Sequence, residues 1–151
     1  MKEQTSVQFK ITSATLTAAE IQSRLGLAPD ESWKAGDPRG PFNAIEKTHG
    51  FVLVSKQPDR ESLDEHVKAM LKRLAPCATK VGALAAESRI EFSCILHRKA
   101  APALKFERDD LRWLGVMGAQ LTVDFKILAE PPRPAAPSPA AGAPGTRTTS
   151  F

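Results

Sequence analysis

Apolar and polar residues alternate along three segments of the chain, and each alternation predicts a strand with one buried face. A fourth strand is predicted at residues 50–55, because the run GFVLVS is continuously apolar and suits a strand buried on more than one side. The inward positions of the three alternating strands are Val7, Phe9 and Ile11, then Ile90, Phe92, Cys94 and Leu96, and finally Leu121, Val123, Phe125 and Ile127.

The segment between the first two strands predicts a short helix whose start and end both carry a signal. Thr17 and Glu20 have the spacing of a capping box, in which the hydroxyl and the carboxylate each accept a hydrogen bond from a backbone N–H. Gly26 supplies the left-handed residue that commonly follows a helix. We therefore expect the helix to lie between these residues.

Two further helical segments are predicted between the later strands. Ser62 and Glu65 have the spacing of a second capping box, and Pro76 should kink or restart the helix that follows them. The segment ERDDLRWLGVMG carries acidic residues in its first turn, where they suit the helix dipole, and it should end at Gly118. The apolar stripe of the longer helix consists of Leu63, Val67, Met70, Leu71 and Leu74.

The order of these elements is β-α-β-α-β-α-β. One-sided alternation in three of the four strands predicts an α+β domain with a four-stranded, mostly antiparallel sheet and helices on one face, a variant of the ferredoxin-like fold. This single domain should span residues 1–129. Residues 130–151 hold half of the twelve prolines and almost no large apolar residues, so we expect a disordered tail there.

Composition narrows the classes of function. The net charge is +4, but the basic residues are scattered among acids and form no stripe with aromatics, which argues against a nucleic-acid partner. The first residues, MKEQTSVQFK, contain no apolar segment and no apolar run reaches the length of a membrane span, so we expect neither a secretory leader nor a membrane span. The two cysteines lack metal-ligand spacing and are expected to be buried thiols. We therefore expect a cytoplasmic globular protein.

Motifs that would carry catalysis are absent from the sequence. It contains no glycine-rich phosphate loop and no G-x-S-x-G motif, and its three histidines are far apart. Cys94 and His97 cannot pair on one strand, because positions i and i+3 point to opposite faces. Asp109 and Asp110 suit a helix cap better than a catalytic pair. The sequence thus predicts a non-enzymatic protein without cofactor or metal.

The segment SWKAGDPRGP, residues 32–41, is the main candidate for partner binding. It places Trp33 beside Lys34, Asp37 and Arg39, and tryptophan and arginine are the residue types that dominate protein interfaces. The charged side chains would steer and orient a protein partner. The competing interpretation is structural, with the indole folding back over the helix end to cover Leu27.

A second candidate surface is the open face of the sheet. Glu91, Ser93 and Asp124 point outward from their strands and would serve a small-molecule sensor or an enzyme, which is the alternative function.

Trp113 belongs either to a helix that is buried on two sides, the interpretation we favour, or to a homodimer contact. We expect a monomer or a weak homodimer.

The segment LTAAEIQSRLGLAPDESWKAGD, the helix LDEHVKAMLKRL and the closing LGVMGAQLTVDFKI together resemble the uncharacterised bacterial family called domain of unknown function 4279. The resemblance implies a small α+β domain without recorded enzymatic activity. It also suggests an immunity-type role, in which the chain binds and neutralises a toxin. The matching positions are Ile21, Leu25, Gly26, Leu27, Pro29, Trp33, Gly36 and Asp37, followed by Gly118, Ala119, Leu121, Val123 and Asp124.

Overall fold

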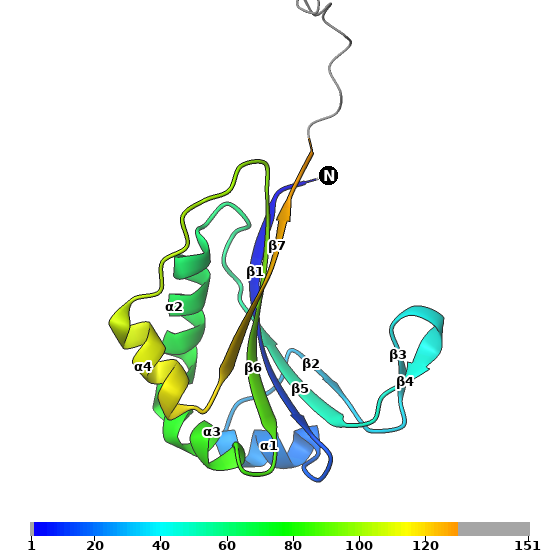
Figure 1. The fold of residues 1–151 in the computed structure, drawn as a ribbon. Coiled ribbons are helices and arrows are strands. Elements are labelled where there is room, and N and C mark those ends of the chain that lie inside the picture. Colours follow the sequence, from blue (N-terminus) through cyan, green and yellow to red (C-terminus); the bar gives the residue numbers. More distant parts are fainter. Residues whose placement is uncertain (1, 130–151) are drawn as a thin grey trace, which may run out of the picture.

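A five-stranded mixed sheet forms the centre of the protein, in the order β2-β5-β1-β6-β7 (Figure 1). The structure is a computed structural model that describes residues 2–129, so the predicted tail at residues 130–151 lies outside it. The strands are β1 (Gln4–Ser13), β2 (Glu31–Trp33), β5 (His49–Val54), β6 (Arg89–Arg98) and β7 (Gln120–Ile127).

The strand directions correct the predicted sheet. The central strand β1 is antiparallel to β5 and to β6, β2 is antiparallel to β5, and β6 and β7 are parallel. The α+β class is confirmed, but the four-stranded ferredoxin-like order is wrong. The short strand β2 had not been predicted, and β5 pairs between β1 and β2. A local pattern cannot reveal such an insertion, because it depends on pairing between distant segments.

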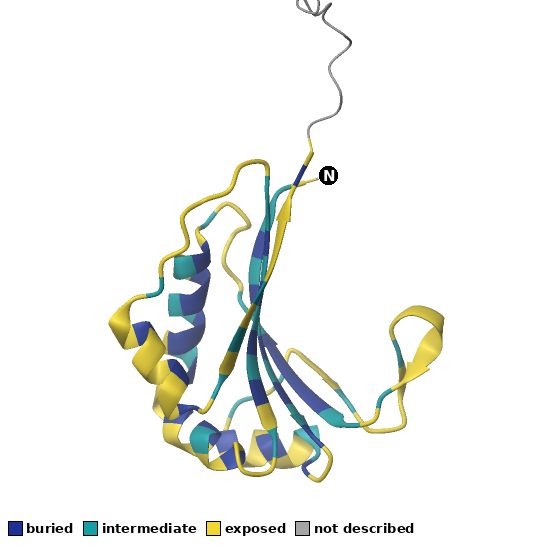
Figure 2. Ribbon diagram, viewed as in Figure 1, coloured by how far each residue is buried: buried dark blue, intermediate teal, exposed yellow. Residues whose placement is uncertain are grey.

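The helices cover one face of the sheet, and the other face stays open (Figures 1 and 2). Pro76 interrupts the helical layer as predicted, because α2 stops at Leu74 and a short 3-10 turn, η2 (Ala75–Cys77), leads into the next helix. Figure 2 shows the buried stripe of α2 turned toward the strands. The helices are α1 (Ala18–Leu25), α2 (Leu63–Leu74), α3 (Ala78–Leu84) and α4 (Arg108–Val116).

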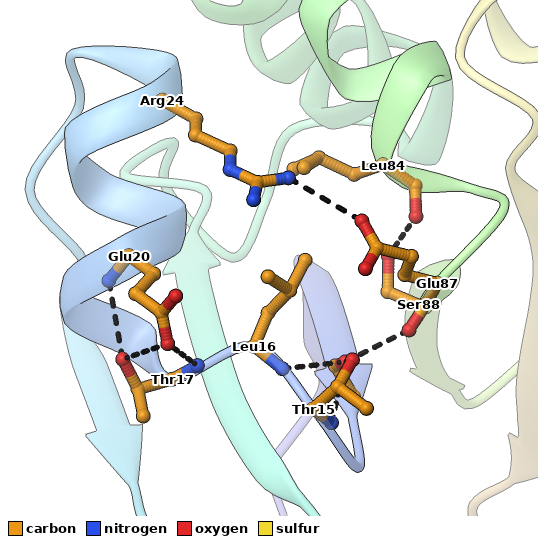
Figure 3. Close-up of polar contacts among 9 residues, drawn as sticks. Thr15, Leu16, Thr17, Glu20, Arg24, Leu84, Glu87 and Ser88 are labelled. Atoms are coloured by element: carbon orange, nitrogen blue, oxygen red, sulfur yellow. Dashed lines mark hydrogen bonds and ion pairs between the residues drawn. The ribbon is translucent and has the colours of Figure 1, made fainter.

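Helix α1 has the two ends that its sequence predicts. The backbone N–H of Thr17 donates to Glu20 Oε1, and the Glu20 N–H donates to Thr17 Oγ1 (Figure 3). The donor–acceptor distance is 3.2 Å in both hydrogen bonds. This hydrogen bonding holds the pKa of the Glu20 carboxyl below its ordinary value. Gly26 ends the helix with φ of 74°. Arg24 then pairs with Glu87 at 3.4 Å and links α1 to the turn before β6.

The core lies between the helices and the inward face of β1, β5 and β6. Phe9 and Phe92 meet edge to face there, with their ring centroids 5.5 Å apart. Cys77 and Cys94 are both buried, and burial raises the pKa of both thiols, that of Cys94 to about 12. Each therefore remains a neutral thiol at physiological pH, as a structural rather than a reactive cysteine.

Three apolar residues of α4 and β7 that the sequence predicted to be buried are exposed. Trp113 on α4 is 38% exposed, and Phe125 and Ile127 on β7 are 37% and 49% exposed. Only Leu121 and Val123 of that strand pack against the core. The reason is that β7 is an edge strand whose second half has no helix packed over it, so inward alternation there does not produce burial. In the part of the chain that the structure describes, no helix has the length and apolarity to cross a membrane.

Candidate functional site

The indole of Trp33 lies flat on the open face of the sheet, over Gly50 of β5. Trp33 and Gly50 are register partners, and a Cβ atom at position 50 would lie 2.1 Å from the indole Cε2 and Cζ2 atoms. Leu27, which the competing interpretation had placed beneath the indole, packs against the core on the helix side instead. Trp33 is therefore half-buried on the sheet.

Arg39 covers the indole from the other side. Its guanidinium carbon lies 3.9 Å from the ring centroid, and because Gly50 occupies one face of the ring, the cation lies over the other. Two carboxylates hold the guanidinium in place, Glu31 at 2.7 Å and Glu46 at 3.2 Å. The result is a layered stack of backbone, indole and guanidinium, fixed by ion pairs at its outer side.

The stack supports a protruding arm, which we define as residues 34–48. The arm contains a two-stranded ribbon of β3 (Pro38–Arg39) and β4 (Ala44–Ile45), joined by the single 3-10 turn η1 (Pro41–Asn43). Figure 1 shows the arm extending on the side of the sheet away from the helices, and Figure 2 shows that most of it is exposed.

Gly36 and Asp37 close the base of the arm. Gly36 has φ of 98°, a conformation that glycine adopts without strain, and its N–H donates to the Glu46 carbonyl at 2.8 Å. The Asp37 carboxylate accepts the backbone N–H of Lys34 at 2.8 Å, and the Asp37 carbonyl accepts the Glu46 N–H at 2.9 Å. The Trp33–Gly36–Asp37 pattern therefore has a role in building the arm.

The most exposed side chains of the arm were missed by the sequence analysis. Phe42 at the tip is 102% exposed and Ile45 on β4 is 61% exposed. Phe42 and Asn43 both have positive φ, 62° and 53°, a region that a bulky residue such as phenylalanine rarely occupies. The available signal was Phe42 itself, a large apolar residue in a turn that follows Gly40 and Pro41.

The four predicted partner-binding residues thus have different surroundings. Trp33 and Arg39 stack on each other, and the Asp37 side chain is used in the turn. Lys34 is exposed, and its ammonium group forms no ion pair among the described residues. A hollow of about 450 Å³ lies between α1 and this segment, lined by Thr17, Ala18, Ala19, Gln22, Pro29, Ser32, Trp33, Lys34 and Asp37.

The predicted sheet-face residues Glu91, Ser93 and Asp124 lie on the open face, as expected from their alternation. They contact neighbouring strands rather than one another. Glu91 accepts a hydrogen bond of 2.6 Å from Thr122, and Asp124 lies 3.8 Å from His97. Ser93 sits in register between Gln8 and Thr122. Within residues 2–129 no group of histidine, cysteine and acidic side chains is arranged to hold a metal ion.

Asp30 fixes β2, and with it the Trp33 stack, to the rest of the domain. Its carboxylate accepts the Val54 N–H at 2.9 Å and pairs with Arg73 of α2 at 3.3 Å and with Lys56 at 3.7 Å. The hydrogen bond from Val54, supported by the nearby cations, holds the pKa of this carboxyl below its ordinary value. Asp30 thereby links β2, β5 and α2.

The Asp30→Asn variant is expected to be less stable than the wild type at pH 7, by about 0.5–1 kcal/mol, because the amide loses the two ion pairs. A carboxyl with a lowered folded-state pKa stabilises the protein above its ordinary value, near 4, and this contribution disappears as pH falls through the folded pKa. The difference between variant and wild type should therefore vanish in acid. Urea unfolding at several pH values tests this, with the exposed Asp59→Asn as a control that should show no such difference.

The fold and the site define a small α+β domain with a one-sided mixed sheet and a protruding arm built around a stacked tryptophan. The chain belongs to the family called domain of unknown function (DUF4279), whose model matches residues 3–128. No curated protein and no solved structure matches the chain. The structure assigns a physical role to the positions that carry the resemblance. Gly26 caps α1, Trp33 covers Gly50, and Gly36 with Asp37 closes the arm.

Proposed function

We propose that the chain is a non-enzymatic protein-binding domain that inserts the tip of its arm into an apolar pocket of a partner protein. The observation that carries the proposal is the full exposure of Phe42 in the turn η1, with Ile45 also exposed on the adjoining strand β4. Full burial of such a side chain contributes about 1.5–3 kcal/mol, so the two residues together offer enough apolar surface to anchor a complex.

The arm is also pre-organised for docking. The ribbon β3–β4, the Arg39 ion pairs and the bonds between Gly36, Asp37 and Glu46 fix its base. A rigid base reduces the conformational entropy that a partner would otherwise have to offset on binding. Lys34 and Lys47 are exposed near this base and would steer an acidic partner surface toward it.

The family resemblance gives the proposal a more specific form. In this form the partner is a toxin, and binding of the chain neutralises it in the cytoplasm. An inhibitor of this kind needs a large and well-anchored interface but no chemistry of its own. A rigid arm with an aromatic tip is suited to entering a concave surface such as an active-site cleft.

We expect Phe42→Gly to abolish partner binding while leaving the stability unchanged or raising it by about 1 kcal/mol, because glycine relieves the positive φ at this position. Thermal unfolding measures the stability. A photo-crosslinking residue placed at position 42 in cells that produce the protein identifies the partner, and co-purification of that partner with Phe42→Gly measures the loss of binding. The crosslink should give one dominant partner, and Ile45→Asp should remove it.

The control places the same crosslinking residue at Leu111, an exposed apolar position on α4. If position 42 gives no product, or gives the same products as position 111, the arm is not a docking element. If the partner identified at position 42 has no toxic activity when produced alone, the toxin form of the proposal is wrong and the binding form stands.

The alternative function is a small-molecule sensor or an enzyme that uses the open sheet face. It is favoured by the polar row that Glu91, Ser93 and Asp124 form with Thr122 and His97. A ligand on this face would be lost in Glu91→Gln and Asp124→Asn and retained in Phe42→Gly, the opposite result to that expected for the arm.

A further inference from the structure

A second cavity, of about 390 Å³, lies on the helix side of the sheet, away from the arm. It is bounded by the start of α2, the end of β6 and the connection from β6 to α4, which forms the loop at the upper left of Figure 1. Its volume falls within the range of about 300–1,000 Å³ that is usual for small-molecule sites. The lining residues are Arg60, Ser62, Leu63, Asp64, Leu96, Arg98, Pro102, Ala103, Leu104, Lys105 and Phe106.

The floor and walls of this cavity are apolar. Leu63 and Leu96 are members of the hydrophobic core, so the cavity reaches the core surface directly. Phe106 packs against the same core, and Leu104 is half-exposed on the opposite wall. An aliphatic or aromatic group placed here would contact leucine and phenylalanine side chains on more than one side, and burial of such a group is favourable.

The rim of the cavity is cationic. Arg60, Arg98 and Lys105 line it, against the single carboxylate of Asp64, which is paired with Lys68 at 3.2 Å. Arg98 donates to Thr5 and to the carbonyl oxygens of Asp59 and Glu61, which fix its position without neutralising its charge. Among the residues that the structure describes, Arg60 and Lys105 form no side-chain hydrogen bond or ion pair.

The wall formed by the β6–α4 connection can adjust to an occupant. Lys99 donates its N–H to Glu3, and Glu107 begins the capping box of α4. Between these two anchors, the backbone of residues 100–106 makes no hydrogen bond to any other described residue. A shift of Leu104 or Phe106 therefore breaks no backbone hydrogen bond.

We propose that this cavity binds an amphipathic carboxylate, with its hydrocarbon body against Leu63, Leu96 and Leu104 and its carboxylate at Arg60 and Lys105. The charge of the rim selects the anion, and the core-lined floor selects the apolar body. The cavity is separate from the arm, so the carboxylate-binding proposal does not depend on the protein-binding function proposed above.

Octanoate is the probe for this site, and isothermal titration calorimetry with the full chain is the measurement. Octanoate should bind, and the uncharged analogue 1-octanol should bind at least about tenfold more weakly, because it lacks the negative charge that the cations of the rim attract and makes no hydrogen bond between two charged groups. Acetate, which lacks the apolar body, should not bind. Amide shift changes in the NMR spectrum should be confined to residues 60–64, 96–98 and 103–106.

The Arg60→Gln and Lys105→Gln variants should each weaken octanoate binding about tenfold and leave 1-octanol binding unchanged. Lys47→Gln removes a lysine charge from the arm and is the matched control, with no expected effect. Leu104→Ser, at a half-exposed position that the fold tolerates, should weaken both probes. Equal affinity for octanoate and 1-octanol, or no change in Arg60→Gln and Lys105→Gln, would overturn the carboxylate assignment. Absence of octanoate binding at millimolar concentration would overturn the site.

Discussion

Gly50→Ala is expected to displace Trp33 from the sheet and to loosen the arm that it supports. The added methyl group would lie 2.1 Å from two atoms of the indole, in space that the ring already fills. The indole must move, and the Arg39 contact over its other face must be lost with it. Overpacking of this kind costs about 1–3 kcal/mol.

Tryptophan fluorescence in a Trp113→Phe background isolates the signal of Trp33 for this test. Emission should shift to longer wavelength in Gly50→Ala, and the thermal midpoint should fall. Gly115→Ala is the matched control, because a Cβ atom there meets nothing within 4 Å and alanine favours the helix. That control should be at least as stable as the parent. Unchanged emission in Gly50→Ala would contradict the stacked arrangement.

His66→Leu is expected to destabilise the domain by about 2–5 kcal/mol, the second large effect. His66 is fully buried, with Nε2 2.9 Å from the Pro58 carbonyl and Nδ1 2.8 Å from Ser55 Oγ. Because a carbonyl can only accept, Nε2 carries the proton and the Ser55 hydroxyl donates to Nδ1. Leucine removes both hydrogen bonds, at about 0.5–1.5 kcal/mol for each, and the change of side-chain shape at a fully buried position adds about 1–3 kcal/mol.

Urea unfolding measures this loss, and His97→Leu is the control. His97 is half-buried on the open face, and within residues 2–129 its side chain makes only the long polar contact to Asp124, so its replacement should change stability by no more than about 0.5 kcal/mol. Ser55 and His66 invite a catalytic interpretation, because a hydrogen bond connects the serine hydroxyl to the imidazole. However, Ser55 also accepts the Val7 N–H at 3.0 Å, which makes the pair a link between β1, β5 and α2. A serine-reactive phosphonate should therefore leave Ser55 unlabelled.

The elements that the sequence predicted well are those defined by local rules. Alternation identified β1, β6 and β7, and the signals at Thr17, Gly26 and Pro76 located the ends of α1 and the break after α2. These features depend on residues within one or two turns of each other. The hydrogen bonding of a capped helix and the alternation of a strand are both present in the sequence itself.

The features that the sequence did not predict depend on pairing between distant segments. β2 has only three residues, and it forms because β5 offers an unpaired edge. Trp113 lies outward on α4, and Phe125 is exposed on the edge strand β7. Both follow from how the elements pack in the tertiary structure, which the periodicity of a single segment does not specify. At the candidate site, the sequence identified Trp33 and Arg39 but could not show that they contact each other rather than a partner.

The insertion of β5 between β1 and β2 has a consequence for the order of folding. β2 pairs with no other strand of the sheet than β5, and β5 must itself be joined to β1. β2 and β5 are closer in the sequence than β1 and β5 and can pair first, but the edge that holds Trp33 joins the sheet only when the β1–β5 pairing forms, and such non-local pairing is slow. A chain in which β1 and β5 are not yet paired lacks the sheet that supports the arm, so the proposed binding surface is complete only in molecules in which the sheet is complete.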